Sequence, residues 1–168
     1  MSITINKVDS ISETEFNTFW DYSRGYILSQ EKPSMITKNS TEEQIKQTIK
    51  NTFFNSNSLF FNIFKNDLLI GIANCNQTND SFLESDGALF GPDENNSRSW
   101  IYSSDYWSAW KVAVDNLNLN GLKSKVMGSV YEAILEGGIN NYYPNSTFTK
   151  ELQSTSDNIY LIKFTHLN

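Results

Sequence analysis

The sequence predicts one α/β domain in which helices pack on a mixed sheet. Stretches in which apolar and polar residues alternate, typical of half-buried strands, are interspersed with stretches whose apolar residues recur every three or four positions, typical of amphipathic helices. The chain has 168 residues, 39% of them hydrophobic, which is enough for one sizeable core and too few for two ordinary domains. No internal repeat or linker interrupts the pattern. We therefore expect residues 1–168 to form a single domain.

The first part of the chain is predicted to form a strand and two helices. Residues 3–8, ITINKV, alternate branched apolar and polar side chains, as a half-buried strand does. Ser12 and Glu15 have the spacing of a capping box at a helix N-terminus. Ser40 and Glu43 repeat this spacing after a Lys-Pro pair that ends the first helix. The apolar residues expected to face the core from these helices are Phe16, Phe19, Trp20, Tyr26, Ile27, Ile45, Ile49 and Phe53.

A β-hairpin is the strongest local prediction. Residues 58–75, SLFFNIFKNDLLIGIANC, contain two apolar, strand-like runs joined at Lys65-Asn66-Asp67. Because Asn and Asp tolerate the positive φ angles of tight hairpin turns, the two runs are expected to pair antiparallel. Cys75, the only cysteine, is interpreted as a small buried residue on the second strand.

The rest of the chain is predicted to form a strand, a helix, a strand, a further helix and two closing strands. The first of these helices is predicted from the helical spacing of Trp107, Trp110, Val114 and Leu117. The expected ranges are Asp86–Phe90 (strand), Ser104–Leu117 (helix, started by Ser104 or Asp105 and ended by Gly121), 122–129 (strand), 130–138 (helix), and 147–152 and 158–164 (strands).

This order of elements resembles that of the GNAT superfamily, the acyl-CoA-dependent N-acyltransferases, over residues 3–164. FNIFKNDLLIGIANC looks like the second and third strands of the family, with Gly71 where the later strand usually carries a glycine. VYEAILEGGI resembles its last helix, which commonly ends in a glycine and an apolar residue, here Gly138 and Ile139. The resemblance rests on the order of all the strands and helices together, because hairpins and glycine-capped helices occur in many folds.

The resemblance implies a GNAT-like α+β fold, with a central twisted mixed sheet of six to seven strands flanked by about four helices. The fourth and fifth strands of such a sheet splay apart at a bulge, and acyl-CoA lies in the gap. Its pyrophosphate sits at the N-terminus of the following helix, where unpaired backbone N–H groups and the helix dipole favour anions. Acetyl-CoA is accordingly the expected co-substrate.

The stretch LFGPDENNSRSW, residues 89–100, occupies the place of the family's pyrophosphate loop. That loop carries the pattern Arg/Gln-x-x-Gly-x-Gly/Ala, because side chains would block close approach of the phosphates to the backbone. Both expected glycine positions hold large residues here, Arg98 and Trp100. By position, the resemblance assigns cofactor binding to Asn95, Asn96, Ser97, Arg98, Ser99 and Trp100.

Two interpretations of this loop are open. In the first, the guanidinium of Arg98 binds the pyrophosphate, Ser97 and Ser99 add hydroxyl donors, and the asparagines adopt the turn conformations of glycine. In the second, the loop is an ordinary polar connection that binds no nucleotide, and Arg98 pairs with an acid such as Asp93 or Glu94. The general frequency of surface ion pairs favours the second.

Direct attack of an amine on a thioester needs a general base, and in this family often a tyrosine that protonates the departing thiolate. Glu84 and Asp86 lie just before or on the fourth strand, where the family often places its base. Ile134 occupies the tyrosine position, so Tyr131, about one turn earlier on the same helix face, is the substitute. Solvated carboxylates and a core tyrosine are the ordinary alternatives.

Composition excludes several classes of function. With 13 basic and 19 acidic residues and no basic stripe, nucleic-acid binding is disfavoured. No apolar run approaches the roughly 20 residues of a membrane-spanning helix, and no secretory signal is recognisable, so a cytoplasmic, reducing setting without membrane association is expected. One cysteine and one histidine, His166, do not supply a metal cluster, so no metal is expected.

The sequence therefore predicts an N-acetyltransferase that transfers an acyl group from acetyl-CoA to a small-molecule amine by direct attack. The alternative is a non-catalytic GNAT-fold module for binding or assembly that has lost the cofactor loop. A third interpretation is an unrelated α+β small-molecule binding domain. The aromatic residues between Trp100 and Trp110 are mostly assigned to the core, although one or two rings could line a ligand cleft or a homodimer interface.

Overall fold

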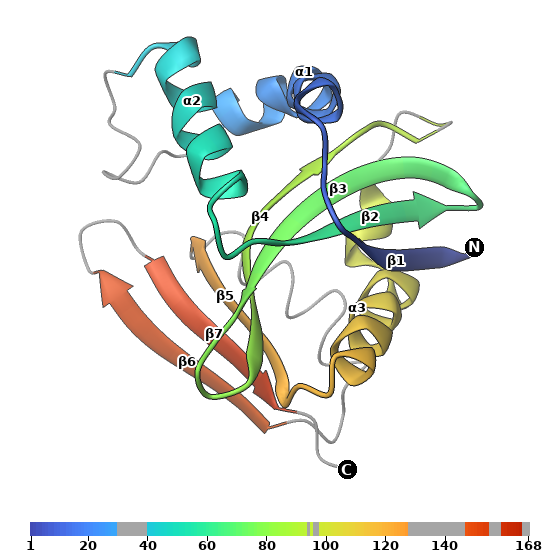
Figure 1. Cartoon of the computed structure of the whole chain (residues 1–168), viewed down its shortest axis with the longest axis vertical. Helices are drawn as coiled ribbons and strands as arrows, with labels where there is room; N and C mark the ends of the chain where they lie inside the picture. Colours follow the sequence, from blue (N-terminus) through green and yellow to red (C-terminus); the bar gives the residue numbers. More distant parts are fainter. Residues whose placement is uncertain (30–39, 94, 96–97, 128–146, 155–158, 166–168) are drawn as a thin grey trace.

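A seven-stranded mixed sheet forms the centre of the molecule (Figure 1). The computed structural model describes residues 1–29, 40–93, 95, 98–127, 147–154 and 159–165. The strand order is β1-β2-β3-β4-β5-β7-β6, and every neighbouring pair is antiparallel except β4 and β5, which are parallel. The elements are β1 (Ile3–Val8), α1 (Glu13–Ser29), α2 (Glu42–Phe53), β2 (Leu59–Lys65), β3 (Leu68–Gln77), β4 (Phe82–Phe90), the 3₁₀ turn η1 (Ser99–Tyr102), α3 (Ser104–Asn116), β5 (Gly121–Met127), β6 (Thr147–Ser154) and β7 (Ile159–Thr165). The predicted mixed sheet is confirmed.

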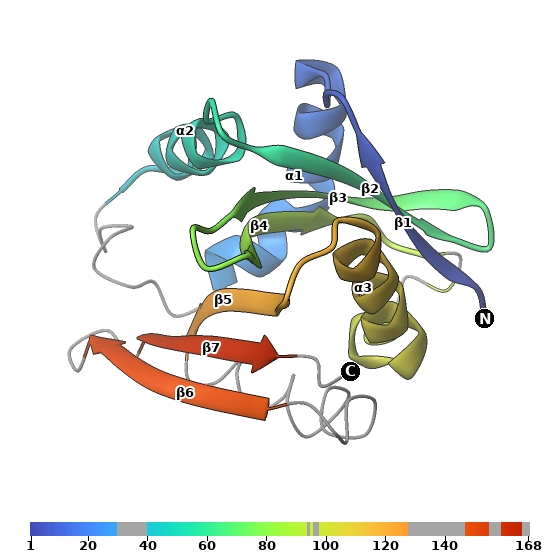
Figure 2. The same ribbon diagram turned by 60° about the horizontal axis from the view of Figure 1, so that its bottom comes forward.

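Helices cover both faces of the sheet (Figures 1 and 2). The α1–α2 face is the one on which Ile72 and Leu89 pack against α1 and α2. The α3 face is the opposite one, on which Ile63, Ala73 and Leu83 pack against α3. Because side chains alternate along a strand, neighbouring residues of β3 and β4 serve different cores.

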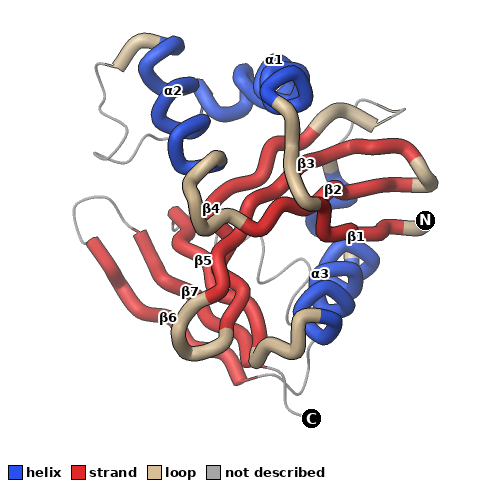
Figure 3. The backbone as a smooth tube through the Cα atoms, in the orientation of Figure 1, coloured by secondary structure: helices blue, strands red, loops and turns tan. Residues whose placement is uncertain are grey.

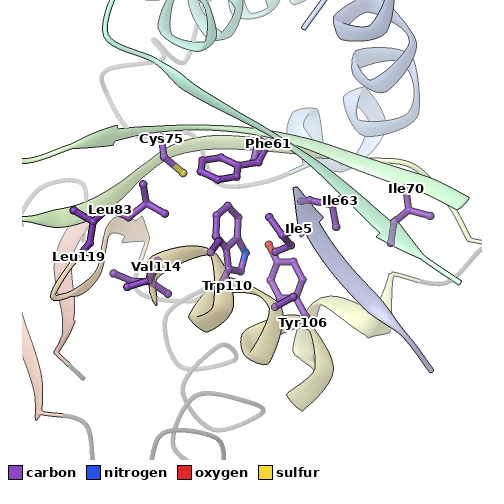
Figure 4. Packing of buried hydrophobic residues seen from close by; sticks show 14 of the residues in the cluster. Ile5, Phe61, Ile63, Ile70, Cys75, Leu83, Tyr106, Trp110, Val114 and Leu119 are labelled. Atoms are coloured by element: carbon purple, nitrogen blue, oxygen red, sulfur yellow. The ribbon is translucent and has the colours of Figure 1, made fainter. Parts of the chain in front are cut away.

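Trp110 of α3 is central to the core of the α3 face. Its indole meets the ring of Phe61 on β2 edge to face, with 5.3 Å between centroids, and Tyr106 lies one helical turn away (Figure 4). Cys75 and Val114 fill the same layer and are fully buried, which confirms the interpretation of the cysteine as a core residue. The aromatic spacing that predicted α3 therefore reflects a buried helix face.

The core of the α1–α2 face is built from phenylalanine rings. Phe16 of α1 lies 5.5 Å from Phe53 and 5.5 Å from Phe54, and Phe53 lies 5.9 Å from Phe60 on β2. Trp20 is also buried, at 2% exposure. Of the core residues predicted for the two helices, Phe16, Phe53 and Trp20 are buried here, and the amphipathic assignment of α1 and α2 is confirmed. The assignment of Tyr26 to the core was wrong, because its side chain is 49% exposed.

The predicted hairpin joins β2 and β3. Asn66 and Asp67 have φ angles of 48° and 67°, the left-handed values expected for its turn. Gly71 follows on β3 at a close approach, because a Cβ there would lie 2.9 Å from Cδ1 of Phe90 on β4. A glycine at this position thus lets the ring of Phe90 pack across the strand.

Of the first two helix starts, one agrees with the sequence prediction and one differs from it. The Ser12–Glu15 capping box is confirmed, with N–H···O distances of 2.8 and 3.1 Å. The second box is formed by Thr41 and Gln44, so its assignment to Ser40 and Glu43 was wrong by one residue. Thr and Gln close a capping box as well as Ser and Glu do, and the shifted start still directs Ile45 into the core.

The ends of α3 also differ. Ser103, not Ser104 or Asp105, is its N-cap, and its hydroxyl accepts from the backbone N–H of Tyr106 at 3.3 Å. The helix ends at Asn116, and Asn118, rather than the predicted Gly121, follows its end in the left-handed conformation, with φ of 58°. Gly121 instead begins β5. The helix predicted over 130–138 lies outside the described residues.

Candidate active site

β4 and β5 run side by side over only part of their length. Cα partners join Phe82–Ser85 of β4 to Gly121–Ser124 of β5, although β4 continues to Phe90 and β5 to Met127. Beyond this paired segment the two strands diverge, as Figures 1 and 3 show. Strands that separate in this way present backbone N–H and C=O groups that an extended ligand can hydrogen-bond.

The place beyond Ser85 and Ser124 at which β4 and β5 separate, here called the parting, coincides with a β-bulge in β4. Asn74 of β3 lies opposite Gly87, and the next residue, Cys75, lies opposite Ser85, so Asp86 is the extra residue. A bulge bends its strand and increases its twist, which accounts for β4 leaving β5 at this point. The expected splay of the fourth and fifth strands at a bulge is confirmed.

Glu84 lies beside the parting on the α1–α2 face. It is opposite Asn76 on β3 and Lys123 on β5, and its chain neighbour Leu83 points to the α3 face. Its side chain is half-buried and makes no ion pair or hydrogen bond with a described residue. Lys123 instead binds both carboxylate oxygens of Asp80 at 2.8 Å. The carboxylate of Glu84 therefore has no partner among the described side chains.

The structure describes the other predicted catalytic residues less fully. Asp86 is the bulge residue of β4, and only its backbone is described. Tyr131 lies outside the described residues, as does His166.

Burial raises the pKa of the Tyr106 phenol far above its ordinary value, so this tyrosine remains protonated in the core.

The start of the predicted cofactor loop is anchored by buried polar contacts. The backbone N–H of Gly91 donates to Ile70 O at 2.7 Å. Asp93 forms an ion pair with Lys65 of β2, with 2.7 Å between Oδ2 and Nζ, and the two side chains are only 5% and 11% exposed. The other carboxylate oxygen of Asp93 accepts from the N–H of Asn95 at 3.0 Å. This connection is therefore fixed to the β2–β3 hairpin.

Arg98 is held by α1. Its Nη2 donates to the carbonyl oxygen of Tyr22, and its guanidinium lies 5.9 Å from the ring centroid of Tyr26. The suggested pairing of Arg98 with Asp93 is wrong, because Asp93 pairs with Lys65. No carboxylate in the described part of the chain pairs with Arg98. Its charge is therefore uncompensated there.

Trp100 belongs to the core of the α3 face. It is 2% exposed, and its indole lies 5.2 Å from Phe90 and 5.6 Å from Tyr106, both edge to face. Its side chain therefore presents no surface to a ligand, which leaves only the backbone of Trp100 for the predicted cofactor binding. Asn95 and Ser99 are exposed, whereas Asn96 and Ser97 lie outside the described residues.

The sequence analysis did not identify Lys65 and Asn74 as residues near the candidate active site. Each is a charged or polar residue at a position of the β2–β3 hairpin where the alternation predicts a buried side chain. Lys65 falls two residues after the core position Ile63, so its charge enters the α3 side of the sheet and needs a partner. Asn74 is a polar residue within the otherwise apolar run LLIGIANC, and it is completely buried.

Two further absences concern only the part of the chain that the structure describes. No group of three or more His, Cys, Asp or Glu side chains is placed there to hold a metal ion. None of the helices described there has the length and apolar character needed to cross a membrane.

Solved structures show the same fold. No family model matches the chain. No curated protein matches it either. Among solved structures, it is similar to the N-acetyltransferase PseH of Campylobacter jejuni in complex with acetyl coenzyme A, with a TM-score of 0.54 and 16% identity over 98% of this chain and 99% of that chain.

Two more structures are similar over nearly the whole chain. AAC(6')-Ib in complex with ribostamycin and coenzyme A gives a TM-score of 0.62 at 12% identity, covering 99% of this chain and 94% of that one. A chimera of spermidine N-acetyltransferase SpeG from Vibrio cholerae and hSSAT gives 0.54 at 11% identity, covering 99% and 96%. The chain therefore has the fold of the GNAT N-acetyltransferases.

Proposed function

We propose that the protein is an N-acetyltransferase that transfers an acyl group from acetyl-CoA to a small-molecule amine. The observation that carries the proposal is the parting of β4 and β5 at the Asp86 bulge. The similar structures add support, since two of them are complexes with acetyl coenzyme A or coenzyme A. A thioester lying along the parting would be reached by an amine from the α1–α2 face, where Glu84 lies.

Glu84 is our first choice as general base. An amine nitrogen attacks only after it has lost its extra proton, and the half-buried carboxylate of Glu84 forms no ion pair with a described residue. Asp86 is the second choice, being on the same strand. The C–S bond breaks as the N–C bond forms, and the thiolate then needs a proton, for which Tyr131 remains our proposed donor.

Arg98 is our proposed ligand for the pyrophosphate. Guanidinium–phosphate hydrogen bonds are charge-assisted and strong, and α1 holds Arg98 in place without neutralising its charge. Asn95 and Ser99, both exposed, would add polar donors, and Asn96 and Ser97 keep the same proposed role.

The structure also favours a second candidate, a binding or assembly module without catalysis. The loop has no glycine at the positions where phosphates would approach the backbone, and Trp100 fills the core instead. The N-terminus of α3 is capped by its own Ser103.

The proposal has further parts that rest on the sequence alone. They are a cytoplasmic location, a homodimer, and the absence of nucleic-acid and membrane partners.

Calorimetric titration with acetyl-CoA separates the two candidates. We expect the unmodified protein to bind acetyl-CoA with micromolar affinity. The affinity of Arg98→Ala should be lower by about tenfold or more, because the variant loses charge-assisted hydrogen bonds. Arg24→Ala is the matched control, since Arg24 already pairs with Glu42 at 2.6 Å. The absence of heat up to millimolar acetyl-CoA would establish the non-catalytic module instead.

A further inference from the structure

Phe90, the last residue of β4, turns its backbone polar groups away from β3. One residue further on, the backbone N–H of Gly91 donates to Ile70 O at 2.7 Å, so these two residues form a hydrogen-bonded pair of the antiparallel ladder. Such pairs alternate with pairs that exchange no hydrogen bonds, and Phe90 opposite Gly71 is one of the latter. The N–H and C=O of Phe90 therefore point to the side on which β5 would continue the sheet.

A serine of α1 binds both of these groups. Ser23 Oγ accepts from the backbone N–H of Phe90 at 3.0 Å, and the same hydroxyl donates to Phe90 O at 3.0 Å. β5 pairs with β4 only as far as Ser85, so its paired segment ends before Phe90. Ser23 is 3% exposed, which makes its hydroxyl a fixed partner rather than one exchanged with water. The helix thus supplies the hydrogen bonds that a neighbouring strand would otherwise supply.

α1 also lies close against the connection that follows β4. A Cβ at Gly91 would lie 3.2 Å from Cε1 of Phe19 and 3.3 Å from Cδ2 of Tyr22, closer than ordinary van der Waals contact, and a glycine at this position permits the approach. The carbonyl oxygen of Tyr22 accepts from Arg98 Nη2. Two adjacent residues of one helix, Tyr22 and Ser23, therefore hold the proposed pyrophosphate ligand and the end of β4.

We propose that α1 takes the place of β5 along the end of β4, and that Ser23 is thereby a positioning residue for acetyl-CoA. The inference rests on the proposed function and adds a residue that acts through Phe90. Pairing of Phe90 with β5 would close the parting, and leaving its N–H and C=O without partners is unfavourable in a half-buried position. Ser23 removes both alternatives, so the parting is open before the cofactor binds.

Hydrogen exchange of the backbone amides tests the first half of the proposal without any ligand. In Ser23→Ala the amide of Phe90 loses its acceptor, so we expect it to exchange about tenfold faster or more than in the unmodified protein. The amide of Gly91 donates to Ile70 O within the ladder and should keep its rate. Equal exchange rates at Phe90 in the two proteins would overturn the replacement of β5 by α1.

Calorimetric titration with acetyl-CoA tests the second half. The affinity of Ser23→Ala should be about tenfold lower than that of the unmodified protein, because the end of β4 is no longer held in place for the ligand. Ser23→Thr retains the hydroxyl and should recover most of the affinity. A Ser23→Ala variant that binds as tightly as the unmodified protein, or a Ser23→Thr variant that binds no better than Ser23→Ala, would overturn the positioning role.

Thr18→Ala is the matched control. Thr18 is an exposed residue of the same helix, and its hydroxyl donates to the carbonyl oxygen of Thr14 at 3.0 Å. Its loss should change neither the exchange rate at Phe90 nor the affinity for acetyl-CoA. Alanine is a strong helix former, so Ser23→Ala is expected to fold. Should it not fold, Ser23→Cys, whose thiol is a weaker hydrogen-bonding group, takes its place in both measurements.

The two measurements also separate this inference from the proposed function. Failure of acetyl-CoA to bind even the unmodified protein would remove the proposed function and the positioning role of Ser23 with it. Faster exchange at Phe90 in Ser23→Ala would then still establish that α1 replaces β5 along the end of β4.

Discussion

Replacing Lys65 by methionine should lower the free energy of unfolding by about 3–5 kcal/mol, because it leaves the carboxylate of Asp93 buried without its cation. The two side chains are 11% and 5% exposed, so solvent does little to screen the loss. The effect should reach beyond stability, since the pair fixes the β4–η1 connection to the β2–β3 hairpin. Urea unfolding followed by tryptophan fluorescence measures the change.

The double variant Lys65→Met/Asp93→Leu should recover most of that stability, since it removes both buried charges together. Lys111→Met is the matched control. Lys111 pairs with Asp115 four residues along α3, with both side chains more than 40% exposed, and such pairs contribute about 0.3–0.5 kcal/mol. A Lys65→Met variant as stable as Lys111→Met would contradict the structural role of the buried pair.

Replacing Glu84 by glutamine should lower kcat for acetyl transfer about 10²- to 10⁴-fold while leaving the affinity for acetyl-CoA unchanged. Glutamine has nearly the same shape, and Glu84 makes no ion pair in the described chain that the change would break. Without the base, only the fraction of acceptor that is already neutral can react. The activity of the variant should therefore keep rising with pH until the amine itself is deprotonated.

The measurement is thiol release from acetyl-CoA with an acceptor found by screening alkylamines, over a range of pH. Glu43→Gln is the control, because Glu43 is an exposed acid in the first turn of α2 and lies outside the proposed site. Equal rates for Glu84→Gln and the unmodified protein would assign the base to another residue, first of all Asp86.

The fold was largely predictable because its signals are local. Alternation identified β1 and the β2–β3 hairpin, and the left-handed turn at Asn66 and Asp67 followed from their identity. Helical spacing identified the buried face of α3. Adjacent capping residues limited the precision at helix ends, as at α2, where Ser40 and Thr41 are both competent N-caps.

The candidate site was less predictable because its contacts are long-range. Arg98 binds α1 at Tyr22, 76 residues away, and Asp93 pairs with Lys65, 28 residues away. Neither contact can be predicted from the spacing of residues along the sequence. The bulge at Asp86 likewise appears only in the register of β4 against β3, so the resemblance suggested a parting that the sequence alone did not locate.

A structure of the protein determined with coenzyme A bound tests whether the cofactor binds where β4 and β5 separate. We expect the pantetheine chain to lie between β4 and β5 beyond Ser85 and Ser124, with backbone groups of the two strands hydrogen-bonded to it. Coenzyme A bound elsewhere, or a gap between the strands that the chain's own side chains fill while the ligand is present in excess, would rule this binding site out.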